Sequence, residues 1–427
     1  MILRHITSAL VEALSDNPVV FLGGARQTGK STLAQWLASS KTKVRGKSYS
    51  AKYLTLDNSV VLSAVQSDPS GFIANAGENL IIDEVQRVPE LFLAIKAEVD
   101  KKRIPGRFFL TGSADVMLLP TVTESLTGRL EILTLWPFSR GEIEGRKENF
   151  IDNIFSEEKK FSVSSSSESI GRDDLIKHIV LGGFPEALNR DSYPKDPSDE
   201  RRRAWFESYV TSIIQRDILN LSSIEGATAI PRLFSILTHR TMTLMNFSEL
   251  SRISGFPQST LKRYIALLET TFLIQTLPAW SRNLNKRLLK TPKLYVCDTG
   301  LACAMLGINE ERLLSDGMLL GPLLENFIIT EIRKELVWSV VKPKMYHLRT
   351  LTGQEVDLVL EDASGMLVGI EIKSSSAVNA GDFKGLKALA ELAGKEFIRG
   401  VILYAGSESV PFGKNLWALP VSSLWKM

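Results

Sequence analysis

The sequence predicts an α/β protein whose first part is built on a parallel sheet. Its apolar runs recur as short strands separated by helical stretches, which is the pattern of a parallel α/β sheet. The first strand, Val19-Val20-Phe21-Leu22, leads into Gly24 to Ser31, which fits G-x-x-x-x-G-K-[ST] at every fixed position. Helical sequence from Thr32 to Leu37 follows. Strand, glycine-containing loop and helix in this order predict a phosphate-binding loop.

Length and composition limit the possible classes of protein. With 427 residues the chain is long enough for roughly three domains. It is 44% hydrophobic and 23% charged, no apolar stretch reaches the ~18 residues that span a bilayer, and charge interrupts the N-terminus before a signal-peptide core forms. We therefore expect a cytoplasmic protein without a membrane partner. Cys297 and Cys303 have neither metal-site nor redox-motif spacing, which argues against disulfides and structural zinc.

The chemistry of the loop predicts ATP and Mg²⁺ as cofactors. The glycines let successive N–H groups face a polyphosphate, Lys30 reaches the phosphates, and the Ser31 hydroxyl ligates Mg²⁺. The alternative is a turn that binds nothing. The residues expected at the nucleotide are Gly24, Ala25, Arg26, Gln27, Thr28, Gly29, Lys30, Ser31, Thr32, Asp83 and Ser113.

Four more strands are expected, and one of them ends in two acids. The expected strands are Tyr53–Asp57, Leu80–Ile82, Arg107–Ser113 and Leu130–Leu135. Asp83 and Glu84 follow the second of these, at the sheet edge where an open α/β fold binds its ligand. We expect Asp83 to hold Mg²⁺ through water and Glu84 to polarise the attacking water. The alternative is a pair of acids that ends a strand or caps the next helix.

Two weaker candidates complete this expected site. Thr111 or Ser113 would hydrogen-bond the γ-phosphate or the attacking water, or else be a turn residue. Arg129 follows a predicted helix and would act as an arginine finger at a neighbouring subunit's nucleotide, or else be a solvated surface arginine. The arginine finger implies a homo-oligomer, possibly a hexameric ring.

The middle of the chain departs from this pattern. Residues 151–174 are rich in Ser, Glu and Lys and are expected as a linker after a core of residues 1–150, with a helical lid in residues 175–230. Arg240 to Lys293 holds nine Lys or Arg and two Glu, and has the helix-turn-helix spacing followed by two strands of a winged helix in residues 231–299. DNA is the expected partner. Its expected contacts are Ser259, Thr260, Lys262 and Arg263 on the second helix and Arg282, Lys286, Arg287 and Lys290 at the tip of the hairpin. The alternative is a module that contacts protein.

A second candidate site lies in residues 300–427. Strands Glu355–Leu360 and Leu367–Lys373 flank a turn, and an antiparallel register centred on Ser364 places Asp357 opposite Glu371 with Lys373 on the same face. Two such carboxylates beside a lysine suit a Mg²⁺-dependent phosphodiesterase, with Glu325 as a third acid. The alternative is a structural cluster in which Lys373 neutralises both acids.

The ordered motifs resemble those of prokaryotic ATP-binding proteins in which an AAA+ P-loop core precedes a winged helix and a restriction-endonuclease-like, PD-(D/E)XK-type domain. The resemblance covers nearly the whole chain and rests on Gly24–Ser31, Ile81–Gln86, Leu110–Ser113, Gly182–Pro185, Arg216–Ile218, Cys297–Leu301 and the acidic hairpin. It implies ATP binding and hydrolysis, with a nuclease-like fold that is not active in every member. Val356 stands where the motif's name expects proline.

Two functions are consistent with these observations. One is an ATPase coupled to DNA binding or processing, with Glu84 and Arg129 as catalytic residues of the ATPase and Asp357, Glu371 and Lys373 as those of a nuclease site. Ser31 and Asp83 would then bind one metal, and Glu325, Asp357 and Glu371 another. The other is a nucleotide-dependent switch or scaffold whose C-terminal domain is a catalytically inactive binding platform.

Overall fold

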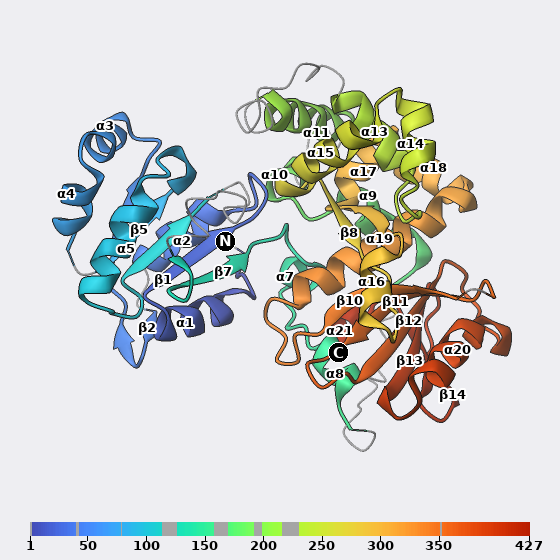
Figure 1. The fold of residues 1–427 in the computed structure, drawn as a ribbon. Coiled ribbons are helices and arrows are strands. Elements are labelled where there is room, and N and C mark those ends of the chain that lie inside the picture. Colours follow the sequence, from blue (N-terminus) through green and yellow to red (C-terminus); the bar gives the residue numbers. More distant parts are fainter. Residues whose placement is uncertain are drawn as a thin grey trace. The chain divides into compact units, whose positions relative to one another are not determined.

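The computed structural model of the chain describes residues 2–39, 42–77, 79–112, 126–157, 170–191, 199–215, 230–350 and 352–427, with only the backbone at residues 191, 286, 288 and 289. The described residues form two compact units (Figure 1). The first unit comprises Leu3–Pro137 with Thr270–Phe272. The second comprises Phe138–Glu269 and Leu273–Met427, with Met1–Ile2.

A five-stranded parallel sheet forms the centre of the first unit, in the order β4-β5-β6-β1-β7. All five runs expected as strands are confirmed. The inner strands β1, β5 and β6 are buried at every residue, which explains why their sequences are continuous apolar runs rather than alternating ones. The strands are β1 (Val19–Gly23), β4 (Lys52–Thr55), β5 (Leu80–Asp83), β6 (Phe108–Thr111) and β7 (Leu130–Thr134).

Helices connect these strands, because parallel neighbours cannot be joined by tight turns. They are α1 (Thr7–Asp16), α2 (Lys30–Ser39), α3 (Ser59–Ser67), α4 (Pro69–Ala74) and α5 (Leu91–Lys101), with the 3₁₀ turn η1 (Val85–Arg87) and the small hairpin β2 (Lys43–Val44) and β3 (Lys47–Ser48). Phe92, Ile95 and Val99 of α5 pack with Phe21 and Phe108 of the sheet in one apolar core. This core holds the carboxyl ends of β1, β5 and β6 together.

The second unit begins with a helical region that contains one hairpin. Its helices are α7 (Arg140–Glu144), α8 (Phe150–Phe155), α9 (Arg172–Leu181), α10 (Pro185–Asp191), α11 (Asp199–Ile213), α13 (Ile230–His239), α14 (Phe247–Ser254), α15 (Gln258–Thr270), α16 (Leu284–Leu289), α17 (Thr299–Leu306), α18 (Glu310–Ser315) and α19 (Gly317–Glu335). Strands β8 (Ile274–Leu277) and β9 (Lys293–Val296) pair antiparallel. Among the described residues, no helix is long and apolar enough to cross a membrane.

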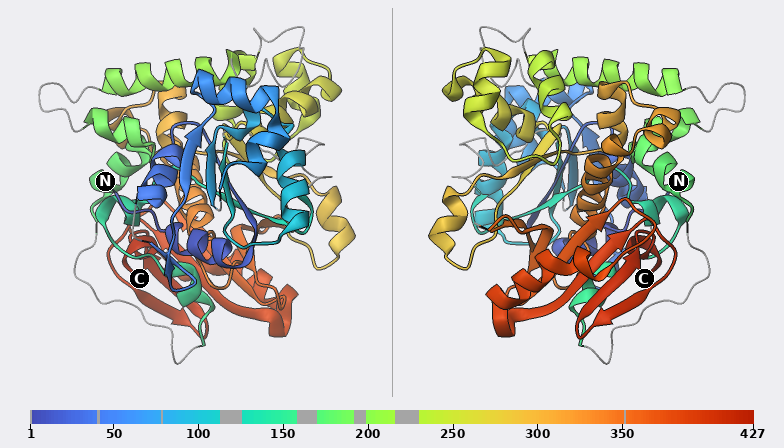
Figure 2. Two further views of the ribbon diagram at one scale, coloured as in Figure 1. Left: turned by 90° about the vertical axis from the view of Figure 1, so that its left-hand side faces the viewer. Right: turned by 90° about the vertical axis from the view of Figure 1, so that its right-hand side faces the viewer.

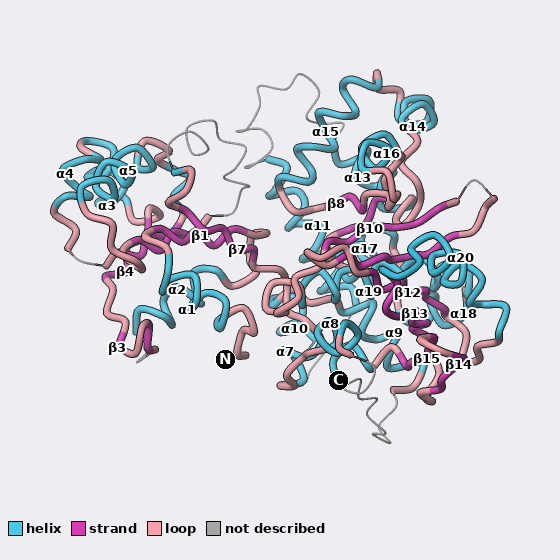
Figure 3. The backbone as a smooth tube through the Cα atoms, turned by 60° about the horizontal axis from the view of Figure 1, so that its bottom comes forward, coloured by secondary structure: helices cyan, strands magenta, loops and turns pink. Residues whose placement is uncertain are grey.

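A six-stranded sheet completes the second unit, in the order β10-β11-β12-β13-β15-β14. Figure 2 draws it in orange and red, and Figure 3 shows its strands in magenta. Its elements are β10 (Lys344–Arg349), β11 (Glu355–Glu361), β12 (Leu367–Lys373), β13 (Phe397–Tyr404), β14 (Val410–Gly413) and β15 (Leu416–Pro420), with α20 (Lys384–Ala393), α21 (Ser423–Lys426) and the 3₁₀ turns η5 (Ala380–Phe383) and η6 (Gly394–Glu396). Leu386 and Leu389 of α20 pack on Val356 and Val359 of β11. A Cβ at Gly385 would lie 1.9 Å from the Glu355 carbonyl, so only glycine allows α20 to approach β11 this closely.

The compact units and their packing divide the chain at other points than two of the expected boundaries. The first unit ends at Pro137 rather than at residue 150. The expected linker begins at residue 151, but its first residues belong to helix α8, whose Phe150, Ile151 and Ile154 are fully buried. The sequence did not predict this helix, because its apolar residues lie within a stretch rich in charged residues. The serine run from Ser162 lies outside the described residues. The second boundary, at residue 300, divides a packed region, because α17 packs against α9, α11 and α13 rather than standing with the C-terminal sheet.

Candidate nucleotide site and C-terminal carboxylate cluster

The loop between β1 and α2 has backbone geometry that glycine makes possible. Gly24 has φ +139°, and a Cβ there would lie 2.2 Å from the Leu135 carbonyl oxygen of the neighbouring chain segment. Gly29 has φ +94°, although the space beside it is open. Glycine is therefore required at Gly24 by contact and conformation together, and at Gly29 by conformation alone. Gln27 adopts φ +60° without being glycine.

The side chain of Lys30 is folded into this loop. Its Nζ donates to the carbonyl of Gly24 at 2.9 Å and to that of Ala25 at 2.6 Å, and the residue is 5% exposed. The loop is also held from outside by Arg4, which donates to the carbonyls of Thr28 at 3.0 Å and Trp136 at 2.6 Å. Sequence reasoning missed Arg4, because no motif links it to a loop more than 20 residues away. The loop is therefore shaped by cations that bind its carbonyls.

Asp83 collects hydroxyl groups from three other elements. Its carboxylate accepts from Ser31 Oγ of α2 at 3.1 Å, from Tyr53 Oη of β4 at 2.8 Å and from Thr111 Oγ1 of β6. Burial and the hydrogen bond to Asp83 raise the pKa of Tyr53 to about 12, so the phenol remains a donor. The structure thus brings together the predicted pair Ser31 and Asp83 and the candidate Thr111, and adds Tyr53, which the sequence analysis did not identify.

Glu84 follows directly in a left-handed conformation, with φ +61° and ψ +40°. Gln86 Nε2 donates to its carboxylate at 2.6 Å, which holds the side chain in place. Burial raises the pKa of Glu84, while the positive charges of Lys30 and Arg26 oppose that rise. A carboxylate with a raised pKa near the loop lysine is suited to accept a proton from water.

The other two candidates of this site are placed differently. Arg129 lies directly before β7. The first residue of β7 pairs with Val19 and its last with Gly23, just before the phosphate loop, so Arg129 lies at the edge of the sheet opposite that loop. It donates to Asp100 at 2.6 Å and to the Thr127 carbonyl at 3.1 Å. Arg129 therefore cannot serve the nucleotide of its own subunit. Ser113 lies outside the described residues.

The basic segment divides into exposed and internal cations. Lys262 and Arg263 on α15 are exposed, as is Ser259. Arg287, expected at an exposed hairpin tip, instead forms a two-pronged ion pair with Glu361 and lies over the Tyr346 ring at 4.9 Å. The expectation that Arg287 contacts DNA is therefore wrong, because its guanidinium is used inside the second unit. Arg282 is 3.6 Å from Glu396 with a side chain that is 73% exposed, and only the backbone is described at residue 286.

The predicted register of the C-terminal hairpin is confirmed. Leu358 pairs with Ile370 and Val359 with Gly369, which is the register centred on Ser364. The side chain of Asp357 continues this pairing by accepting from the backbone N–H of Ile372 at 3.0 Å. Asp357 and Glu371 therefore lie at neighbouring positions, and Lys373 Nζ contacts Glu371 at 2.9 Å.

Lys293 joins these acids, which the sequence did not indicate. Its Nζ lies 2.6 Å from Glu325 Oε1 and 3.4 Å from Asp357 Oδ1, with partners 32 and 64 residues away in the sequence. The carboxylate cluster thus consists of Glu325, Asp357 and Glu371 with Lys293 and Lys373.

Burial and mutual repulsion raise the pKa values of two acids in the carboxylate cluster. Burial, followed by repulsion from Asp357, raises the pKa of Glu325 to about 8 and that of Glu371 to about 7. Burial alone would lower the pKa of Lys293, but attraction by Glu325 and Asp357 raises it above the usual value. In the described part of the chain, no three His, Cys, Asp or Glu side chains are arranged to hold a metal ion. Of the expected metal set, Glu325 and Asp357 instead share the ammonium group of Lys293, and Glu371 contacts that of Lys373.

Two of the family-like motifs meet in a buried junction of the second unit. Asp298 accepts from the Gly183 N–H at 2.8 Å and from the Leu301 N–H at 3.0 Å. A Cβ at Gly182 would lie 2.2 Å from Asp298 Oδ1, and one at Gly300 would lie 2.5 Å from the Leu181 carbonyl. These motifs are explained by close backbone packing rather than by catalysis.

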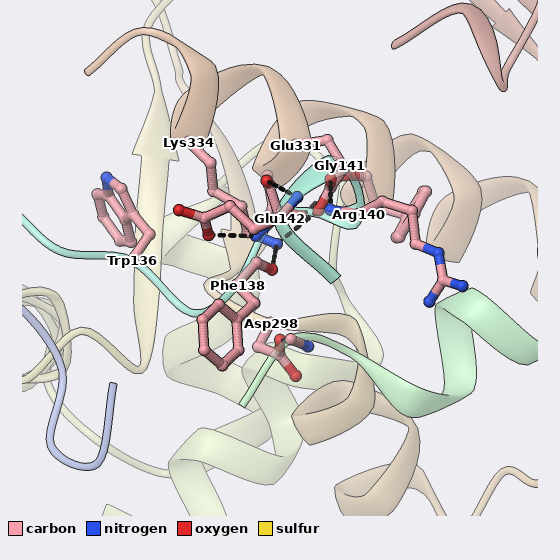
Figure 4. Close-up of polar contacts among 12 residues, drawn as sticks. Trp136, Phe138, Arg140, Gly141, Glu142, Asp298, Glu331 and Lys334 are labelled. Atoms are coloured by element: carbon pink, nitrogen blue, oxygen red, sulfur yellow. Dashed lines mark hydrogen bonds and ion pairs between the residues drawn. The ribbon is translucent and has the colours of Figure 1, made fainter. Parts of the chain in front are cut away.

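Beside this junction, the N-terminus of α7 is fixed by buried charges (Figure 4). Glu331 accepts from the Arg140 N–H at 2.7 Å, and Lys334 donates to Glu331 at 2.5 Å and to the Phe138 carbonyl at 2.9 Å. Burial raises the pKa of Glu331. The segment that opens the second unit is therefore anchored to α19.

Comparison with known proteins identifies the first unit. Residues 16–144 match the family described as AAA domain. Together with the phosphate loop, this match defines an AAA-type P-loop nucleotide-binding domain. Residues 172–312 and 320–424 match two families described as domains of unknown function, DUF8612 and DUF4143.

Similar proteins span almost the whole chain. Proteins of Mycobacterium tuberculosis and Mycobacterium bovis, both named only as uncharacterized, are 28% identical over 423 residues, which is 99% of this chain and 84% of theirs. Among solved structures, AMPPCP-bound DnaA from Aquifex aeolicus is 16% identical, with a TM-score of 0.30 over 62% of this chain and 85% of that one. The Bacillus subtilis DNA clamp loader delta protein is 12% identical, with a TM-score of 0.27 over 78% and 96%. Scores this low carry no inference about function.

Proposed function

We propose that this protein is an ATPase that works as a homo-oligomer and acts on DNA. The observation that carries the ATPase proposal is the convergence of Ser31, Asp83 and Glu84 beside the loop that contains Lys30. Hydrolysis needs a group that orients the attacking water, and the half-buried Glu84, directly after the proposed metal-binding aspartate, is suited to that role.

Ser31 and Asp83 have the donor atoms that a magnesium ion prefers. A hydroxyl and a carboxylate oxygen lie 3.1 Å apart at the loop, and Mg²⁺ favours oxygen ligands from few protein groups together with phosphate. When bound there, Mg²⁺ would neutralise charge on the phosphate oxygens. Thr111 and Tyr53 keep the Asp83 carboxylate oriented toward Ser31 by donating to it.

Lys30 and Glu84 divide the remaining work. Lys30 exchanges its loop carbonyls for phosphate oxygens, while the loop N–H groups bind the polyphosphate. Glu84, held by Gln86, orients the attacking water and takes its proton. The raised pKa of Glu84 brings its basicity closer to neutral pH, where a general base works best.

DNA is the proposed partner because α15 presents exposed positive charge. Lys262 and Arg263 are exposed on a helix that follows α14 in helix-turn-helix spacing. For the C-terminal sheet we favour a binding platform over a metal-dependent nuclease, because two of the acids expected to bind metal, Glu325 and Asp357, contact Lys293. This choice adopts, for that domain, the second of the two functions considered from the sequence.

The ATPase is tested by separating binding from turnover. Lys30→Ala should lose ATP affinity, whereas Glu84→Gln should bind ATP normally and hydrolyse it about 10²-fold or more slowly, because only the base is removed. Binding is measured with a fluorescent ATP analogue and turnover by phosphate release with Mg²⁺. Glu90→Gln, an exposed acid shortly after Glu84, is the matched control and should leave both unchanged. Hydrolysis by Glu84→Gln at the wild-type rate would show that Glu84 is not the base.

A further inference from the structure

We propose that Lys293 is the resident cation of the carboxylate cluster and excludes divalent metal ions from it. The cluster would then be a permanently neutralised junction between the β8–β9 hairpin and the C-terminal sheet. This inference goes beyond the proposed ATPase and does not depend on it, because every residue it uses belongs to the second unit.

The position of the Lys293 ammonium is the first argument. It lies 2.6 Å from Glu325 and 3.4 Å from Asp357, the two acids that would have to share a metal ion. Magnesium requires its oxygen ligands at about 2.0–2.1 Å and keeps several waters. The side chain of Lys293 is 8% exposed, and those of Glu325 and Asp357 are 15% and 16% exposed. A hydrated metal ion has no room between these acids while Lys293 remains.

The backbone that carries Lys293 is the second argument. Lys293 pairs with Leu277 of β8 and forms a bridge with Leu244, so β9 is held from both sides. Three residues further on, Val296 exchanges two hydrogen bonds with the fully buried amide of Asn326, at 2.9 and 2.8 Å. Asn326 is the neighbour of Glu325 on α19. These hydrogen bonds between β9 and α19 therefore fix both members of the Lys293–Glu325 pair, and displacing Lys293 would require breaking them.

The second lysine of the cluster serves as a contrast. The Lys373 side chain is 31% exposed and contacts Glu371 at 2.9 Å, and among the described residues it forms no ion pair with Glu325 or Asp357. Glu371 Oε2 is buried and has no hydrogen-bond partner among the described residues. Lys373 thus lies at the rim, and its removal would not clear the space between Glu325 and Asp357. A metal ion could enter between Glu325 and Asp357 only if Lys293 were removed.

The experiment measures Mn²⁺ binding by the full-length protein without nucleotide, using calorimetry and the electron paramagnetic resonance signal of free Mn²⁺. The wild type should show no saturable site that depends on Asp357. Lys293→Met should melt at a lower temperature without metal, and should gain a site at least roughly tenfold tighter than any in the wild type, with partial recovery of the melting temperature.

Matched variants assign the result to the cluster. Lys373→Met removes the rim lysine and should create no site, and Lys293→Arg should keep the site closed. Asp357→Asn added to Lys293→Met should abolish the gained site. If Lys293→Met does not fold, the wild type still decides: saturable Mn²⁺ binding that Asp357→Asn removes and Asp83→Asn does not would overturn the proposal. Failure of Lys293→Met, when folded, to bind Mn²⁺ would overturn it as well, and neither result would alter the ATPase assay.

Discussion

Buried His178 lowers the acid stability of the second unit, as does buried His347. His178 of α9 is 8% exposed and packs edge-to-face on Trp425, with ring centroids 5.9 Å apart. Burial, together with the smaller effects of the charges of Arg140 and Lys177, lowers the pKa of His178 to about 3. Below the ordinary value of about 6.5 the unfolded chain binds a proton that the folded chain cannot, so stability falls with falling pH.

Replacing His178 isolates this effect. His178→Phe retains an aromatic ring beside Trp425 and removes the titration. Between pH 7 and pH 4.5 the wild type should lose about 2–3 kcal/mol more unfolding free energy than the variant. The measurement is urea unfolding at both pH values. Buried acids such as Glu331, whose pKa is raised, act in the opposite direction, but they are common to both proteins and cancel in the comparison.

The exposed His239 of α13 provides the control. His239→Phe should change stability equally at the two pH values. A pH dependence for His178→Phe equal to that of the wild type would mean that His178 does not control acid stability.

Individual residues also show how far a motif predicts a site. Ser31 and Asp83 meet as expected, because the phosphate loop after β1 and the end of β5 both lie at the carboxyl edge of one parallel sheet. Lys293 was counted only as the last residue of the basic segment, because a lysine at the start of a strand carries no local sign of burial. Its partners come from α19 and β11, and only the tertiary fold brings them to it.

At the scale of elements, turn geometry made the C-terminal hairpin predictable. A short turn between two strands leaves few possible registers, and the symmetric one gave the observed pairing of Leu358 with Ile370. The β8–β9 connection is longer and was expected as an extended wing. It contains helix α16 instead, and Arg287 from this helix pairs with Glu361 of β11. Local charge could not reveal that this arginine has an internal partner.

Because the cations of α15 are exposed and Arg287 of α16 is internal, we predict that α15 is the basic element that binds DNA. Lys262→Ala with Arg263→Ala should weaken DNA binding and reduce the slope of log affinity against log salt by about 2, because each lost phosphate contact releases roughly one counterion fewer. The measurement is fluorescence anisotropy of labelled duplex DNA over a range of salt concentrations.

Arg287→Ala is the matched control for this prediction. It removes one positive charge from the basic segment, against two in the double variant, but breaks an internal ion pair, so it should lower the melting temperature and leave the salt slope unchanged. An unchanged slope for the α15 double variant would assign this region to protein contacts, which is the alternative considered from the sequence.

At the scale of the whole molecule, the candidate nucleotide site lies within the first of the two units. The first unit holds the phosphate loop, Asp83 and Glu84 but has Arg129 at the opposite edge of its sheet. In a parallel sheet the amino ends of the strands lie at one edge and the carboxyl ends at the opposite edge. Arg129 precedes the amino end of β7, so no local rearrangement brings it to its own nucleotide site at the carboxyl ends. If Arg129 contributes to hydrolysis, it must do so on a neighbouring copy of the chain.

Mixing two inactive variants tests this role. Arg129→Ala should bind ATP and hydrolyse it slowly, and Lys30→Ala should fail to bind. In an equal random mixture about a quarter of the interfaces would combine an intact loop from one copy with an intact Arg129 from the other, so hydrolysis should exceed that of either variant alone. Phosphate release is measured as the proportions of the two variants are changed.

Asp100 distinguishes a catalytic arginine from a structural one. Asp100 pairs with Arg129 at 2.6 Å, with side chains that are 44% and 30% exposed. Asp100→Ala breaks the same ion pair but leaves the arginine, so it should preserve hydrolysis if Arg129 acts on a neighbouring nucleotide. If Arg129 only stabilises the first unit, Asp100→Ala and Arg129→Ala should lower the melting temperature alike and mixing should restore nothing. A gain on mixing, with Asp100→Ala active, requires that each nucleotide site be completed by another copy.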